Sequence, residues 1–130
     1  MAKTYKASNI KERAQQTAAW CRDNSPTQYP VVVRWKPELK SKAYAEASKV
    51  GRKFYIDLSW KRLRNSYGVM NETIIHEWSH CSVWLEHRDI FNPVHDPIFS
   101  LEFGRLYSLW NDGDGFDESK LYKFKKVRLR

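Results

Sequence analysis

Cysteine is scarce in this sequence. Cys21 and Cys81 are the two cysteines among 130 residues, and they do not form a CxxC pair. A disulfide scaffold and a cysteine-based zinc ribbon both need more thiols at closer spacing, so the sequence disfavours both. We expect two free, buried thiols.

Long apolar runs are also missing. No uninterrupted apolar stretch approaches the roughly 20 residues needed to span a bilayer, and the start, MAKTYKASNIKER, is too polar for a secretory signal. Internal repeats and low-complexity linkers are absent as well. We therefore expect a cytoplasmic protein with no membrane partner.

The residues that are abundant point to one compact, basic domain. Hydrophobic residues make up 42% of the chain and aromatic residues 15%, which is enough to bury a core, so residues 1–130 are predicted to form a single domain. Lys and Arg outnumber Asp and Glu by 23 to 15, which gives a net charge of +8. That excess favours an anionic partner, although many basic proteins are simply soluble.

Periodicity predicts an α+β fold that begins with a helix and continues with a small sheet. In residues 9–24 small and apolar side chains recur at helical spacing, with Asn9 as N-cap and Glu12 three residues later. The predicted buried stripe of this helix is Ile10, Ala14, Thr17, Ala18 and Cys21. Strands are predicted at VVVRW (31–35), AYAEAS (43–48) and FYIDLSW (54–60), with a turn around Gly51, in an antiparallel or mixed sheet.

A second helix is predicted over residues 71–85, with Asn71 as its cap and Met70 placed to contact Ile75. At helical spacing its apolar stripe consists of Ile74, Trp78, Cys81 and Leu85. This helix contains the segment IIHEWSH, in which two histidines lie four residues apart with a glutamate beside the first.

His76 and His80 fall on a face away from that apolar stripe, about 6 Å apart at their attachment points. One tetrahedral zinc ion can bridge two imidazoles at this spacing, and Glu77 would then lean over the metal without binding it. HExxH also occurs by chance in proteins that bind no metal, so a helix with two exposed histidines is the alternative interpretation.

A third ligand must come from further along the chain. His87 lies about 10.5 Å beyond His80 along the helix axis, which is too far to share one ion. The metzincin pattern requires Gly and His where this chain has Val83 and Glu86. His95 is the preferred ligand, because a turn precedes it and Asp96-Pro97 begins a new helix directly after it. Glu102, within that new helix, is the rival.

Taken together, TIIHEWSH and the HDPIF segment that begins 15 positions after His80 resemble the SprT-like zinc metallopeptidase family, whose members show HExxH followed by HGxxF. The resemblance extends over residues 9–110. It implies that His76, His80 and His95 hold one Zn²⁺ per chain, that Glu77 is the catalytic base, and that Phe99 is a packing residue.

The resemblance also implies a zincin-like fold, with an N-terminal helix, a small sheet, the HExxH helix and a following C-terminal helix. Asp96 replaces the family's usual Gly, and the C-terminal CxxC zinc ribbon of many members is absent. The chain therefore resembles the minimal form of the family, of the kind seen in bacteria and bacteriophages.

The expected activity is zinc-dependent hydrolysis of a peptide bond in a protein or peptide substrate. Zinc with three histidine ligands lowers the pKa of a bound water to about 7 and polarises a carbonyl. Glu77 would take the water's proton and deliver it to the departing amine. Tyr67 and Tyr107 are candidate oxyanion donors, and AYAEAS or its neighbour is a candidate sheet edge for an extended peptide.

Residues 116–130 are predicted to form a basic C-terminal arm or edge strand, because no acid follows Glu118 and basic residues alternate with aromatic and aliphatic ones. Such an arm could bind phosphates and stack bases, or its lysines could simply protect a strand edge from pairing. A second basic run, KRLR (61–64), is interpreted as a solvated face.

Similarity to a family that includes proteases acting on DNA-bound proteins favours nucleic acid as the partner of the arm. The candidate contact residues are Lys123, Lys125, Lys126, Arg128 and Arg130. The alternative function is a non-enzymatic module that binds nucleic acid or protein and in which the metal site is structural.

Overall fold

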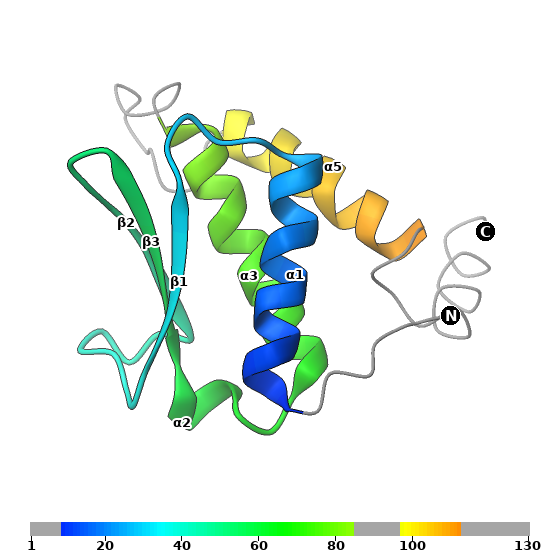
Figure 1. The fold of residues 1–130 in the computed structure, drawn as a ribbon. Coiled ribbons are helices and arrows are strands. Elements are labelled where there is room, and N and C mark those ends of the chain that lie inside the picture. Colours follow the sequence, from blue (N-terminus) through cyan, green and yellow to red (C-terminus); the bar gives the residue numbers. More distant parts are fainter. Residues whose placement is uncertain (1–8, 85–96, 113–130) are drawn as a thin grey trace.

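The computed structural model describes residues 9–84 and 97–112, which form an α+β arrangement of four helices and a three-stranded mixed sheet. The elements in chain order are α1 (Ile10–Asn24), β1 (Val31–Lys36), β2 (Ala45–Val50), β3 (Lys53–Ser59), α2 (Trp60–Leu63), α3 (Tyr67–Ser82) and α5 (Pro97–Asp112). Helices α1 and α3 lie side by side on one face of the sheet, and α5 packs against α3 (Figure 1).

The N-terminal helix is confirmed as the sequence predicts it. The side chain of Asn9 accepts a hydrogen bond from the backbone N–H of Glu12 at 2.8 Å, which caps α1. The buried residues of this helix are Ile10, Ala14, Thr17, Ala18 and Cys21. Cys21 and Cys81 are both free and buried, and burial raises the pKa of each thiol, so neither is a reactive thiolate.

The three predicted strands form a sheet in the order β1-β3-β2. β2 and β3 make the expected antiparallel hairpin, and Gly51 adopts the positive φ of 61° that its turn requires. β1 instead pairs with β3 in parallel, so the sheet is mixed. β2 is an edge strand of this sheet and lies two residues later than AYAEAS.

The predicted start of the HExxH helix is wrong. α3 begins at Tyr67, and the side chain of Ser66 caps it by accepting a hydrogen bond from the N–H of Val69 at 3.1 Å. Asn71 lies inside the helix, where its Oδ1 accepts a buried hydrogen bond of 2.8 Å from the hydroxyl of Thr17. With the start four residues earlier, Met70 is a helical core residue and not a residue that precedes the cap.

The predicted apolar stripe of α3 is confirmed where the structure describes it, since Ile74, Trp78 and Cys81 are buried; Leu85 lies outside the described residues. α1 packs on this part of α3, and the indole N–H of Trp78 donates to the carbonyl of Ser25 at 2.8 Å. Within residues 9–84 and 97–112, no helix has the length and apolar character that crossing a membrane demands.

Candidate metal centre

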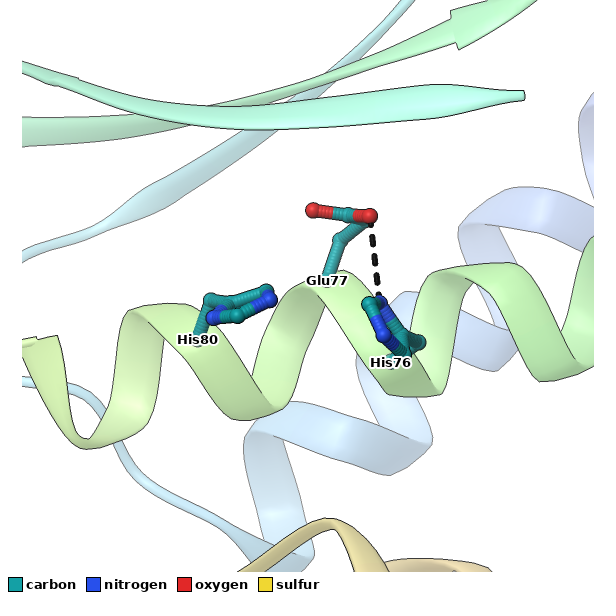
Figure 2. A group of neighbouring side chains, drawn as sticks. All are labelled: His76, Glu77 and His80. Atoms are coloured by element: carbon teal, nitrogen blue, oxygen red, sulfur yellow. Dashed lines mark hydrogen bonds and ion pairs between the residues drawn. The ribbon is translucent and has the colours of Figure 1, made fainter. Parts of the chain in front are cut away.

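His76, Glu77 and His80 come together on α3 as a group that could hold a metal ion. One ligand atom from each residue lies within 4.8 Å of the others, and the two imidazole centroids are 5.1 Å apart. Both histidines project from successive turns of the same helix face (Figure 2). The adjacency predicted from HExxH is therefore present.

These side chains are more buried than a solvated face would make them. His80 and Glu77 each expose 9% of their surface, while His76 is half-buried. The face that carries the histidines is covered because α5 packs against it, so α3 is enclosed by the sheet, α1 and α5. The histidines of this helix are therefore not exposed, and their binding of a metal stays a prediction.

Phenylalanines of α5 hold the imidazole rings. Phe99 stacks on His80 with ring centroids 4.1 Å apart and an angle of 16°, and it meets His76 edge-on at 5.1 Å. Phe103 approaches His76 in the same edge-on manner at 5.3 Å. The expected packing role of Phe99 is confirmed. Phe103 was not predicted, although it follows Phe99 by four residues, a spacing that places both side chains on the same face of a helix.

The carboxylate of Glu77 contacts His76 and lies on the side of α3 that faces the sheet. Its Oε2 lies 3.2 Å from Nδ1 of His76, the contact drawn as a dashed line in Figure 2. A carboxylate that contacts one ring nitrogen fixes the orientation of that ring. In Figure 2 the carboxylate points from α3 toward the strands, where α3 contacts β2.

Two members of the group, His76 and Glu77, line a groove of about 480 Å³, and His80 does not. The groove is bounded by the residues that lead into β2, by α3 between Val69 and Glu77, and by one residue of α5. Its lining residues are Ala43, Tyr44, Ala45, Val69, Glu72, Thr73, His76, Glu77 and Phe103. The candidate sheet edge AYAEAS thus lies beside the candidate metal group. An elongated molecule in this groove would reach both.

Glu102 is engaged elsewhere. Its Oε2 accepts hydrogen bonds from the hydroxyl of Ser25 and, at 2.6 Å, from Arg105. Burial of the carboxylate raises its pKa, but these hydrogen bonds and the charge of Arg105 outweigh that effect, so the pKa of Glu102 is lowered. Within the described residues, the candidate ligand group consists of His76, Glu77 and His80, without Glu102.

His95, the favoured third ligand, and the arm residues Lys123, Lys125, Lys126, Arg128 and Arg130 lie outside the described residues, as do His87 and Asp96. Pro97 is the first residue of α5, as predicted. The assignment of His95 therefore stays a prediction.

Neither candidate oxyanion tyrosine lies in the groove. Tyr67 is the first residue of α3, about 13.5 Å from His76 along the axis, and the guanidinium of Arg13 lies over its ring at 5.4 Å. Tyr107 lines a neighbouring hollow of about 310 Å³ with Ser66 and Trp110. The structure does not bring either tyrosine into the metal group.

No protein-family model matches this chain, and no curated protein matches it either. The resemblance to the SprT-like family thus rests on the two motifs in the sequence.

Proposed function

We propose that this protein is a cytoplasmic zinc metallopeptidase of the SprT-like kind, with a zincin-like fold, and that it hydrolyses peptide bonds in proteins, including proteins associated with DNA. The observation that supports this proposal is the convergence of His76, Glu77 and His80 on α3, where His76 and Glu77 line a groove bounded by an edge strand. A purely structural metal site would not need such an opening.

The donor set fits zinc. Imidazole is a preferred zinc ligand, catalytic zinc sites commonly have three protein ligands, and an open groove leaves room for a fourth position. His76 and His80 would be two of these ligands, and His95 is the proposed third. When bound, zinc supplies Lewis acidity toward a water molecule and a substrate carbonyl.

Residues of the chain would supply proton transfer, support for the metal ligands and positioning of the substrate. Glu77 lines the groove and would accept a proton from the attacking water and pass it to the leaving amine. Phe99 and Phe103 pack against the two imidazoles and would limit their rotation, which would lower the entropy lost on binding a metal. The start of β2 would position an extended peptide through backbone hydrogen bonds.

The first experiment is the metal content of the purified protein, measured by elemental mass spectrometry. We expect about one zinc per chain in the wild type, loss of zinc in His95→Ala, and retention in Glu102→Ala. Glu102→Ala is the matched control, because Glu102 is the rival ligand from the same region. An absence of zinc from the wild type, even after reconstitution, would contradict the proposal.

The second experiment separates catalysis from metal binding. Glu77→Gln should keep its zinc and lose cleavage of an unfolded protein such as reduced casein by about 10²-fold or more, which is the usual contribution of a general base. Asp23→Asn removes a carboxylate from an exposed turn of α1 and should retain full activity. Retained cleavage in Glu77→Gln would remove Glu77 from the mechanism.

A further inference from the structure

The groove continues from the metal group along α3 toward the start of that helix. Glu72 lies one helical turn before His76, so the two side chains share a face, and both line the groove. Around Glu72 the walls are apolar: Val69 and Tyr44 expose 41% and 47% of their surface, and Phe103 closes the side formed by α5.

Glu72 is an exposed carboxylate that makes no hydrogen bond or ion pair with any residue in the described parts of the chain. Other acidic residues of the described chain are paired with cations: Glu38 with Lys42 and Lys61, Asp57 with Arg34, and Glu102 with Arg105. Glu72 therefore faces the groove as a carboxylate that no Lys or Arg of the described residues neutralises, in a chain of 23 basic and 15 acidic residues.

We propose that Glu72 determines substrate specificity by binding the side chain of a lysine or arginine in the substrate; this inference rests on the proposed peptidase function. The aliphatic stem of such a side chain packs on Val69, Tyr44 and Phe103, and its cationic head reaches the carboxylate. An acidic side chain is repelled from the same place. The substrate class is therefore basic protein segments.

The spacing along α3 limits where the basic residue lies relative to the scissile bond. Glu72 precedes Glu77 by five residues, which corresponds to about 7.5 Å along the helix axis. An extended peptide covers that distance in about two residues. The basic residue therefore lies within about two residues of the bond that is cut.

The test compares short Ala–Gly peptides that carry a single lysine with the same peptides carrying Nε-acetyl-lysine, which has the same stem but no charge. In the wild type, kcat/KM should favour lysine by about threefold to tenfold, a modest factor because the groove is open to solvent. Glu72→Gln should bring the ratio to about one, and Glu72→Lys should favour a glutamate peptide instead. Asp23→Asn, which removes the same charge outside the groove, should keep the wild-type ratio.

A binding measurement keeps the outcome independent of hydrolysis. Fluorescence anisotropy of the labelled lysine and acetyl-lysine peptides is measured on Glu77→Gln and on Glu77→Gln/Glu72→Gln. Cleavage without a lysine preference in the wild type, or a preference unchanged by Glu72→Gln, overturns the proposal and leaves the peptidase standing. Lysine-dependent binding that requires Glu72, without cleavage by the wild type, supports the subsite and overturns the hydrolytic function. Binding that ignores the lysine charge overturns the subsite in either case.

Discussion

The ring of His80 is held by a stacked phenylalanine, so the metal group depends on an aromatic contact as well as on HExxH. Phe99 is buried and touches both imidazoles. A histidine that keeps one orientation in the absence of metal loses less freedom when it binds one. Phe99 thus links the packing of α5 to the affinity of the site.

Replacing Phe99 should therefore weaken both folding and metal binding. Phe99→Ala is expected to cost about 3–5 kcal/mol of unfolding free energy and to reduce zinc affinity about 10–100-fold, as removal of a supporting contact commonly does. Urea unfolding and competition with a zinc indicator measure the two effects. The control is Leu106→Ala, which removes a buried side chain of the same helix. Equal zinc affinity of the folded Phe99 and Leu106 variants would contradict a supporting role for Phe99.

The buried pair of Thr17 and Asn71 offers a second residue-scale prediction. Thr17→Val keeps the shape of the side chain but leaves Oδ1 of Asn71 without its donor, which should cost about 1–3 kcal/mol. The double variant Thr17→Val/Asn71→Leu leaves no buried polar group without a partner. Its loss of unfolding free energy should therefore be smaller than the sum of the losses in the two single variants. Strictly additive losses in urea unfolding would show that the hydrogen bond is not the cause.

At the scale of elements, the start of α3 shows what a local pattern misses. Both Ser66 and Asn71 are good N-cap residues, and the sequence favoured Asn71 because the periodic apolar stripe starts just after it. Inside the helix, the side chain of Asn71 has a hydrogen-bond partner in Thr17, which lies 54 residues earlier in the chain. Asn71 is buried because α1 supplies a donor for it.

Ser66 is therefore the capping residue to test. Ser66→Ala removes the acceptor for the N–H of Val69 and should cost about 1 kcal/mol of unfolding free energy. Ser100, exposed on α5, gives the matched control, since Ser100→Ala should change stability by less than about 0.5 kcal/mol. If the two variants unfolded at the same urea concentration, Ser66 would not act as the cap.

The elements differ in how much of them could be predicted. The helix α1, the β2–β3 hairpin and the first residue of α5 were predictable because each is specified by neighbours in the sequence. The parallel pairing of β1 with β3 was not, because residues between these strands leave both directions open. The packing of α5 on His80 was also not predicted, because packing between helices depends on contacts between residues distant in sequence.

Glu102 joins α5 to the end of α1, and this link should depend on pH. The lowered pKa means that its contribution to stability is complete above the unfolded value of about 4.3 and is lost as pH falls through the folded value. Glu102→Gln should thus cost about 1 kcal/mol near pH 7 and progressively less below pH of about 4. Urea unfolding of both proteins across this range checks the sign. A difference that stays constant as pH falls would exclude the carboxylate as its source.

For the whole molecule, the distribution of charge is the feature that connects the candidate metal group to the proposed substrates. The groove contains two acidic residues, Glu72 and Glu77, in a chain with a net charge of +8. The two carboxylates would therefore attract a basic substrate segment to the groove, while the net charge of the chain favours an anionic partner. A peptidase with this composition would bind DNA through its basic residues and still accept a basic peptide.

The basic arm is the proposed nucleic-acid contact, and salt dependence is the property that tests it. Replacing Lys123, Lys125, Lys126, Arg128 and Arg130 by Gln should weaken binding to a single-stranded oligonucleotide and reduce the slope of log K against log salt by up to about 3.5, since each lost phosphate contact removes about 0.7. The control replaces three basic residues, Lys61, Arg62 and Arg64, of which Lys61 pairs with Glu38 and Arg62 lies over the ring of Tyr44. An equal effect per charge removed in both sets would mean that net charge alone attracts the nucleic acid. Arm-dependent binding that survives chelation, in a protein that cleaves no peptide, would instead favour the non-enzymatic function.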